Sequence, residues 1–375
     1  MSARRVLVVT NDFPPRQGGI QSFVYELARR LPADQVAVYA SDYPGAAAFD
    51  AEQDFPVRRH PSGLLIPTPD ARRRVLQARR DFGSTAVWFG ASAPLGLLAA
   101  PLRRAGVQRV VASSHGHEIG WRMLPAARQA LRRIGNQVDV VTYLTEYTRQ
   151  RLVGAFGPRP NLVQLSPGVD LDAFNPAVSG AAVRQRHGLT GRPVVVCVSR
   201  LVPRKGQDVL IQAMPAIAAK VEGAALLIVG GGPYEQKLRT LARRAGVADR
   251  VVFTGPAPAA ELPQHFAAGD VFAMPCRTRR LGMDVEGLGI VFLEASATGL
   301  PVVAGDSGGA PDAVRQGITG VVVDGIDVAA VAEQVSGLLA DPRRAAAMGT
   351  AGRHWTEQSW QWNTMADRLA GLLRL

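Results

Sequence analysis

The stretch MDVEGLGIVFLEAS, residues 283–296, carries two carboxylates eight positions apart. Glycines follow Glu286 at positions 287 and 289, so we expect Glu286 in a loop and a helix beginning near Gly289 or Ile290. Glu286 would then face a bound sugar, and Glu294 within the helix could accept hydrogen bonds from a ribose. Neighbouring loop N–H groups would be available to a phosphate. Two solvent-exposed carboxylates explain the same spacing, so spacing alone does not decide.

A cluster of cations follows the apolar run VVVCVS in the segment CVSRLVPRKGQD. Arg200, Arg204 and Lys205 come just after the expected strand, at the edge of a sheet where ligands bind in open α/β folds. Arginine offers a planar fork and lysine a point charge, and both stabilise a departing diphosphate. The alternative is a solvated basic loop, which the position after a strand and the following Gly206 disfavour.

A pair of glycines in NDFPPRQGGIQSF follows the first apolar run, RVLVVT. Gly18 and Gly19 precede an amphipathic helical pattern, where backbone N–H groups and a helix N-terminus can receive an anion. The pair does not match the spacing GxGxxG. An ordinary turn therefore explains it equally well.

The residues that could bind a metal do not form a convincing set. His115 and His117 are two positions apart, with no cysteine or carboxylate pair beside them. The triplet Asp170-Leu-Asp172 has the form DxD found in metal-dependent sites, but it falls in a Pro- and Gly-rich joint, where capping is the better explanation. Cys197 lies inside an apolar run as a buried thiol would. We expect no metal requirement and no disulfide.

The order of apolar runs predicts the elements that carry these residues. A chain of 375 residues exceeds a single core, so two domains are expected. Short β-branched runs alternate with helical patterns, which favours parallel sheets, and the pattern pauses at residues 166–176. We therefore expect Rossmann-like domains at 1–168 and 169–354, with strand ends around one cleft. A helical tail, 355–375, is expected to pack across the domain junction.

The positive charge is concentrated in the first half of the chain. Residues 1–168 hold 22 arginines against 12 acidic residues, a net charge of +10, whereas the remainder has a net charge of +2. This asymmetry favours an anionic partner, either nucleic acid or an acidic lipid surface, although a solvated arginine-rich surface explains it equally well. Basic stripes interleaved with stacking aromatics are absent, so we expect no nucleic acid.

Two arginine-rich segments could meet an acidic membrane. Residues 70–82 and 120–135 combine arginines with apolar side chains, as an interfacial helix would, although part of each apolar face must pack inward. Charge reversal of Arg72, Arg73 and Arg74 is then expected to abolish binding to acidic vesicles. The chain has no apolar run long enough to span a bilayer and no signal-peptide pattern, so we expect a cytoplasmic protein.

Five strings in this order resemble the retaining GT-B glycosyltransferases of family four: GGIQSF, SRLVPRKGQD, IVGGGPY, EGLGIVFLEASATGLPVVA and SGGAPDAV. The resemblance extends over the whole chain and implies two Rossmann-like domains with parallel sheets facing a central cleft. It also implies that a sugar moves from a nucleotide donor to an acceptor, with no metal and no other cofactor. Retention is usually explained in this family by front-face attack assisted by the leaving diphosphate, and the sequence does not decide this against double displacement.

The resemblance also implies roles for single residues. His117 matches the active-site histidine of the family, near the 6-hydroxyl of the sugar, and Glu286 is expected to contact the transferred hexose. Asp12 is expected to border the acceptor pocket. The donor-binding residues implied are Gly18, Gly19, Arg200, Lys205, Glu286, Gly287, Leu288, Gly289 and Glu294.

Within family four, the strings NDFPPRQGGIQSF, SSHGHEIGW and MPCRTRRLGMDVEGLGIVFLEAS are similar to the branch that uses GDP-mannose as donor. The acceptor in that branch is an anionic phosphatidylinositol monomannoside, mannosylated through an α-1,6 linkage. The likeness implies a peripheral protein at the inner face of the plasma membrane, in contact with acidic lipids. Another nucleotide sugar or acceptor, or a sugar-nucleotide epimerase of the same fold, remains as an alternative.

Overall fold

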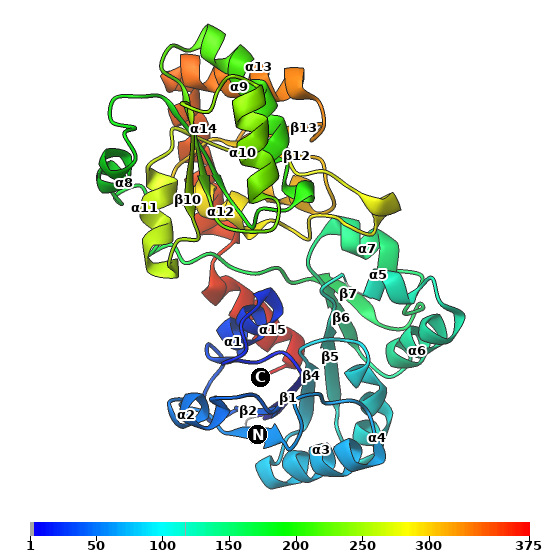
Figure 1. Ribbon diagram of the computed structural model, residues 1–375. Coiled ribbons are helices and arrows are strands. Elements are labelled where there is room, and N and C mark those ends of the chain that lie inside the picture. The colour runs from blue at the N-terminus through cyan, green and yellow to red at the C-terminus, as the bar shows by residue number, and fades with distance from the viewer. Residues whose placement is uncertain (1–3, 117) are drawn as a thin grey trace. The chain divides into compact units, whose positions relative to one another are not determined.

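The computed structural model describes residues 4–116 and 118–375, which form two compact units (Figure 1). Unit 1 comprises the chain up to Gly168 together with Trp362–Leu375, and unit 2 is Val169–Gln361. Each unit is built on one parallel β-sheet with helices on its faces. The prediction of two Rossmann-like α/β domains is confirmed.

The sheet of unit 1 has seven parallel strands in the order β3-β2-β1-β4-β5-β6-β7. The strands are β1 Val6–Thr10, β2 Val36–Ser41, β3 Val57–His60, β4 Ala86–Phe89, β5 Arg109–Ser113, β6 Val140–Tyr143 and β7 Asn161–Gln164. Its helices are α1 Gly19–Ala28, α2 Ala46–Ala51, α3 Pro69–Phe82, α4 Ala99–Arg104, α5 Glu118–Trp121, α6 Pro125–Gly135, α7 Glu146–Leu152 and the C-terminal α15 Trp362–Leu373, with a 3-10 turn at Leu95–Leu98.

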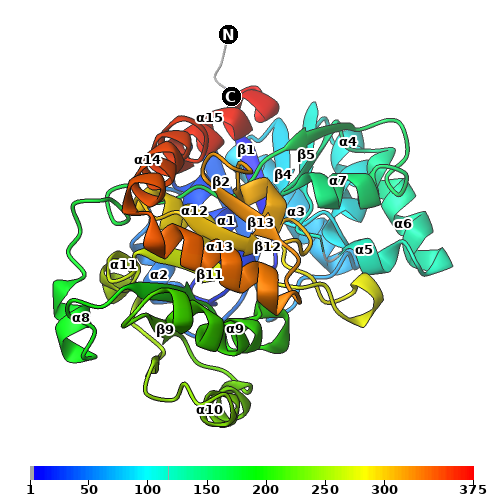
Figure 2. The same cartoon turned by 90° about the horizontal axis from the view of Figure 1, so that it is seen from above.

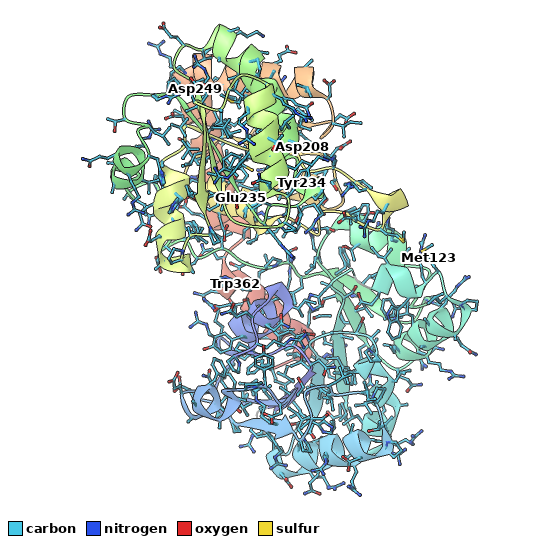
Figure 3. The ribbon with its side chains drawn as sticks, in the orientation of Figure 1. Met123, Asp208, Tyr234, Glu235, Asp249 and Trp362 are labelled. Atoms are coloured by element: carbon cyan, nitrogen blue, oxygen red, sulfur yellow. The ribbon has the colours of Figure 1, made fainter. Side chains whose placement is uncertain are left out.

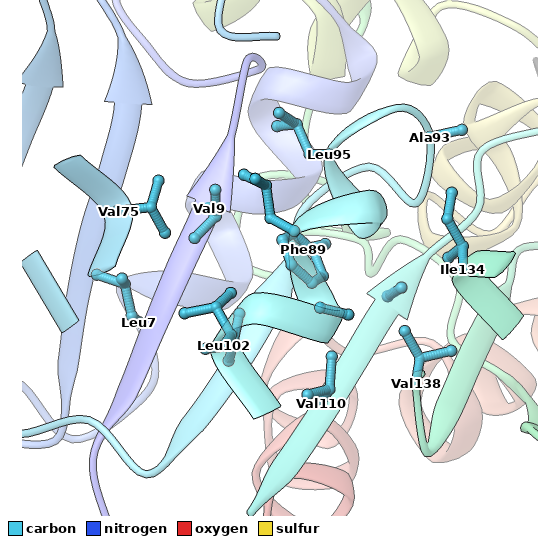
Figure 4. Packing of buried hydrophobic residues seen from close by; sticks show 14 of the residues in the cluster. Leu7, Val9, Val75, Phe89, Ala93, Leu95, Leu102, Val110, Ile134 and Val138 are labelled. Atoms are coloured by element: carbon cyan, nitrogen blue, oxygen red, sulfur yellow. The ribbon is translucent and has the colours of Figure 1, made fainter. Parts of the chain in front are cut away.

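The core of unit 1 is continuous from the central strands to the helices beside them (Figure 4). Val9 of β1, Phe89 of β4, Leu102 of α4 and Ile134 of α6 belong to one buried cluster. Strands covered on both faces must be apolar at successive positions, which is why β1 reads VLVVT and is buried throughout. Each such side chain contributes about 1.5–3 kcal/mol by leaving water.

The sheet of unit 2 has six parallel strands in the order β10-β9-β8-β11-β12-β13. The strands are β8 Val194–Val198, β9 Ala225–Val229, β10 Val251–Gly255, β11 Val271–Met274, β12 Val302–Gly305 and β13 Gly320–Val323. Its α-helices are α8 Ala181–Arg186, α9 Gln207–Lys220, α10 Glu235–Arg244, α11 Leu262–Ala267, α12 Ile290–Ala297, α13 Val328–Ala340 and α14 Pro342–Ser359. Short 3-10 turns lie at Pro203–Lys205, Ala259–Glu261, Arg280–Gly282 and Ala310–Ala313. Helices α9 and α13 pack side by side (Figure 2).

Each sheet has one point at which the strand order reverses. In unit 1 the reversal lies between β1 and β4, and in unit 2 it lies between β8 and β11. Ligands of open parallel sheets bind beyond the carboxyl ends of the two strands at such a point. We therefore expect ligand-binding residues in the loops that follow β1, β4, β8 and β11.

Two elements differ from the sequence-based expectation. Strand β3 has the sequence VRRH, which contains no apolar run that would predict a strand. It lies at the edge of the sheet, where Arg59 pairs with Asp50. The expected tail, 355–375, is divided between the two units: residues up to Ser359 complete α14 in unit 2, and α15 packs beside α1 within unit 1.

Candidate functional site

A buried ion pair lies at the reversal point of unit 2. Lys205 Nζ is 2.7 Å from Glu286 Oε2, and both side chains are at most one-tenth exposed. Lys205 follows β8 and Glu286 follows β11, so the fold brings together two predicted residues 81 positions apart. A buried lysine and carboxylate each lose hydration, which is tolerated here because they compensate one another.

The loop that carries Glu286 is held through its backbone. Glu286 N–H donates to Ser307 Oγ at 3.2 Å, and Gly309 N–H donates to Glu286 O at 2.9 Å. A Cβ at Gly308, whose φ is +59°, would stand 2.0 Å from Glu286 O, so this contact requires glycine. The string SGGAPDAV therefore positions the carboxylate loop, although none of its residues was assigned a role from the sequence.

The loop that carries Lys205 is fixed against the exit of β11. Gly206, with φ +79°, lies so close to Pro275 that a Cβ would stand 1.9 Å from the Pro275 carbonyl oxygen. Arg277 N–H donates to the Arg204 carbonyl at 2.8 Å. The two loops at the reversal point therefore have little freedom to separate.

Further cations surround this pair. Arg204 lies 3.9 Å from Glu286 and 3.7 Å from Asp284, which is also 3.8 Å from Arg279. Arg200 is exposed just beyond β8. Arg200, Arg204, Lys205 and Arg279 exceed the nearby carboxylates in number, and this excess of positive charge suits a diphosphate.

A second cluster of side chains links the loops that follow strands β8, β9 and β11. Asp208 at the start of α9 accepts a hydrogen bond from Arg277 at 2.7 Å and another from the Tyr234 hydroxyl at 3.1 Å. Burial and the neighbouring Asp208 carboxylate raise the pKa of Tyr234. Asp208 and Tyr234 lie together beside the α9 and α10 helices in Figure 3. This cluster holds the loops after β8, β9 and β11 together, and no local pattern of residues predicts it.

Glu294 lies within α12, one turn into the helix that Gly289 caps. Burial raises the pKa of its carboxyl from an ordinary 4.5 to about 7. Such a group is protonated or ionised according to its surroundings, and a ligand hydroxyl donating to it would favour the ionised form. This behaviour is typical of a carboxylate prepared for a polar ligand.

We expect Glu294→Gln to stabilise unit 2 in a pH-dependent way. Between about pH 5 and pH 7 the folded protein keeps a proton that the unfolded chain has released, so the stability of the wild type falls as the pH rises through this range. The variant should gain about 1–3 kcal/mol in free energy of unfolding near pH 8 and nothing near pH 4.5. Urea denaturation at both pH values measures this. Glu357→Gln on α14 serves as control, and parallel pH curves for Glu294→Gln and wild type would exclude the explanation.

In unit 1, the predicted residues lie where α1 begins. Gly18 caps α1, and Gly19 is its first residue, with open space where a side chain would project. Asp12, in the loop after β1, accepts a hydrogen bond from Gln21 Nε2 at 2.7 Å. A Cβ at Gly18 would stand 2.2 Å from Gln21 Oε1. Asp12 and the glycine pair are therefore linked through the buried Gln21, at the reversal point of this sheet.

The predicted catalytic residue His117 lies outside the described residues. Its neighbour Glu118 is fully buried and receives hydrogen bonds from Ser92 at 2.5 Å, Ser114 at 2.8 Å and the Gly116 N–H at 3.2 Å. His115 contacts the Gly90 carbonyl at 2.6 Å. Glu118 thus fixes the loop after β5 to the loop after β4. Sequence reasoning missed it, and its only signal was an acid directly after HGH.

Other candidate groups have structural roles. Asp170 accepts hydrogen bonds from the N–H groups of Asp172 and Ala173, which closes a turn. Cys197 and Cys276 are buried thiols whose pKa burial raises to about 12. Among the described residues no group of three His, Cys, Asp or Glu side chains could hold a metal ion. Over the same residues, no helix is both long and apolar enough to cross a membrane.

The comparison with protein families gives two matches that follow one another along the chain. Residues 17–173 match the model described as Glycosyltransferase Family 4, and residues 181–355 match Glycosyl transferases group 1.

Relatives of nearly full length are similar to this chain. A GDP-mannose-dependent alpha-(1-6)-phosphatidylinositol monomannoside mannosyltransferase of Mycolicibacterium smegmatis is 57% identical over 98% of each chain. The GDP-mannose-dependent monoacylated alpha-(1-6)-phosphatidylinositol monomannoside mannosyltransferase of Corynebacterium glutamicum is 48% identical over 100% of this chain and 98% of its own.

Solved structures are similar in fold. A glycosyltransferase from Rickettsia africae has a TM-score of 0.79 at 16% identity, covering 99% of this chain and 98% of its own. Sucrose-phosphate synthase from Thermosynechococcus elongatus has a TM-score of 0.75 at 21% identity, with the same shares of both chains covered.

Proposed function

We propose, from the premise that this chain belongs to glycosyltransferase family 4, that it transfers mannose from GDP-mannose to phosphatidylinositol monomannoside. The transfer retains the anomeric configuration and forms an α-1,6 linkage, as a step in the synthesis of phosphatidylinositol mannosides. The observation that carries the proposal is 57% identity over 98% of the chain with a relative of that name.

The cations at the end of β8 would bind the donor diphosphate. In the structure the buried Lys205 pairs with Glu286. A diphosphate bound beside Lys205 carries more negative charge than the Glu286 carboxylate and would replace it as the partner of Lys205. Glu286 is then free to accept hydrogen bonds from the hexose hydroxyls. Arg200 and Arg204 add charge for the leaving GDP. These groups supply the electrostatic stabilisation that a metal would otherwise give, so we propose metal-independent transfer.

Backbone groups and Glu294 would complete the donor site. The N–H groups of Gly287, Leu288 and Gly289 precede α12 and suit a phosphate oxygen. Glu294 is proposed to bind the ribose hydroxyls. Its elevated pKa then falls when hydroxyl groups donate to the carboxylate, so binding should strengthen as the pH rises through about 7.

Unit 1 would supply the acceptor side and a phosphate-binding helix N-terminus. Gly18 and Gly19 begin α1, whose first N–H groups suit a phosphate. His117 is proposed to face the 6-hydroxyl of the mannose at the reaction centre, and Asp12 to border the acceptor pocket. Glu118, fixed by three hydrogen bonds, would hold the loop of His117 in place.

The acceptor is an anionic membrane lipid, so we propose that the protein works as a peripheral protein at the cytoplasmic face of the plasma membrane. The net charge of +10 on residues 1–168 favours contact with acidic lipids. No nucleic-acid partner is expected.

Thermal unfolding with nucleotides tests the donor assignment. Without added metal, GDP and GDP-mannose should raise the melting temperature, whereas UDP, ADP and their glucose conjugates should not. A ligand at 100 times its Kd stabilises the folded state by about 2.7 kcal/mol. A shift with UDP or ADP ligands alone would contradict the donor, and consumption of GDP-mannose without acceptor would favour the epimerase.

A further inference from the structure

One face of unit 1 combines arginines with exposed apolar side chains. Met123, Leu124 and Val153 are 68%, 63% and 46% exposed, and all three lie in the connections around α6 and after α7. Met123 lies at the surface beside α5 and α6 in Figure 3. The arginines of this face are Arg122, Arg128, Arg132, Arg133 and Arg151. We call these eight residues the basic-apolar face.

The arginines of the basic-apolar face are available to an external anion. Within the described part of the chain, no carboxylate lies within 4 Å of any of the five. Arg122 is oriented by donating to the Arg151 carbonyl at 2.9 Å, and the Arg151 guanidinium stacks 3.4 Å from the centre of the Tyr147 ring. Two hollows of about 420 and 530 Å³ adjoin here, and both are lined by Arg122, Met123 and Arg128. Together they form a groove large enough for phosphate head groups.

The exposed apolar side chains are not displaced parts of the core. Helix α6 is anchored by Leu131 and Ile134, which are fully buried. A Cβ at Gly135 would stand 1.9 Å from the Phe156 carbonyl oxygen, so α6 packs directly on the chain after α7. Arg128 and Arg132, one turn apart, occupy the outer face. The face of α6 that points to the core is already packed by Leu131 and Ile134. Met123 and Leu124, just before α6, are therefore free to contact the apolar part of a membrane.

The arginines of the other arginine-rich segment, helix α3, are partly neutralised by ion pairs. On α3, Arg73 and Arg74 both pair with Asp70, and Arg58 of β3 pairs with Asp81. None of the large apolar side chains found exposed among the described residues belongs to α3. Leu64 and Ile66 are 60% and 45% exposed in the connection before α3, so the difference between the two segments is one of charge: the α3 arginines are partly neutralised by Asp70. The sequence predicts that both segments bind an acidic membrane. Because Asp70 pairs with two of the α3 arginines, we replace that expectation for Arg72, Arg73 and Arg74 by a minor contribution from α3.

We propose that the basic-apolar face docks the protein on a bilayer containing anionic phospholipids, a proposal that rests on the proposed function. Lipid phosphates would occupy the groove, while Met123, Leu124 and Val153 enter the interface between head groups and acyl chains. The exposed apolar side chains are aliphatic and cannot stack on bases as a nucleic-acid surface requires. Helix α5 begins at Glu118, so docking here brings the loop after β5 to the membrane, where the acceptor resides.

Flotation of the full-length protein with vesicles tests the surface without using the acceptor. One set contains phosphatidylcholine alone, and the other an equimolar mixture with phosphatidylglycerol. We expect binding only to the mixture. Arg128→Gln with Arg132→Gln should weaken it about 30-fold, from about fivefold per arginine at an anionic surface. The matched control, Arg73→Gln with Arg74→Gln, should change binding by less than about threefold.

A second variant tests the apolar component. Met123→Ser with Leu124→Ser should weaken binding about tenfold, and this loss should persist at high salt, where the contribution of the arginines is screened. All variants should have the melting temperature of the wild type, because the replaced side chains are exposed or paired only at the surface. Wild-type binding by the Arg128 and Arg132 double variant, or an equal loss in the α3 control, would overturn the proposal, as would displacement from vesicles by short duplex DNA.

The rate with a deacylated, water-soluble acceptor separates this proposal from the proposed function. Docking variants should transfer mannose to that acceptor at the wild-type rate and lose activity only on vesicle-bound acceptor. If the wild type transfers mannose to neither acceptor but still binds the anionic vesicles, the proposed function fails and the docking surface stands. A loss of rate with both acceptors in the docking variants would contradict docking as the role of this face.

Discussion

Replacing Lys205 by methionine should lower kcat/KM for GDP-mannose by about 100- to 1,000-fold, the usual cost of removing one preorganised group that stabilises developing charge. Lys205 is one-tenth exposed and 2.7 Å from Glu286. Methionine retains the apolar stem but removes the cation that would neutralise the leaving diphosphate. Steady-state kinetics with varied GDP-mannose measure the effect.

Two further variants show whether this loss belongs to the ion pair. Lys237→Met makes the same chemical change on the exposed face of α10, where Lys237 lies over the Tyr234 ring, and should alter the rate by less than about twofold. Glu286→Gln combined with Lys205→Met should lose less than the product of the single losses, because the two side chains form one unit. Near-normal kcat/KM in Lys205→Met would remove Lys205 from the donor site, and strictly multiplicative losses would show that the two side chains act independently.

Replacing Glu118 by alanine should destabilise unit 1 by about 2–4 kcal/mol, because it leaves several buried donors without an acceptor. The hydroxyls of Ser92 and Ser114 and the N–H of Gly116 all donate to this fully buried carboxylate. Chemical denaturation followed by tryptophan fluorescence reports the loss, since Trp88 and Trp121 lie in unit 1.

The control for Glu118 is an exposed carboxylate of the same unit. Asp81→Ala removes an ion pair with Arg58 in which both side chains are at least 40% exposed, and should lower the stability far less than Glu118→Ala does. Glu118→Gln keeps the shape of the side chain and should lie between the alanine variant and the wild type. Equal stability of Glu118→Ala and Asp81→Ala would show that the loop after β5 does not depend on this carboxylate.

Much of the fold could be predicted because parallel strands are buried on both faces. The run VVVCV at β8 is apolar at every position, and VLVVT at β1 is apolar at all but its last, so both stand out without any partner. The division of the last helices could not be predicted in this way. Trp355 and Trp362 belong to similar amphipathic patterns, yet α14 completes unit 2 and α15 packs on α1 in unit 1. Only the contacts of each helix decide which core it joins.

The sequence by itself determined the types of residue at the site and their place at strand ends: cations after β8, a carboxylate in the glycine-rich loop after β11, and a glycine pair before α1. These follow from local rules, because a loop glycine or a charge after an apolar run is visible within a few positions. The tertiary structure decided the partners. Lys205 forms an ion pair with Glu286, and Arg277 forms one with Asp208. Glu118 accepts hydrogen bonds from the loops after β4 and β5. Such contacts depend on strand order, which brings distant loops to one edge of a sheet, and no local pattern encodes that order.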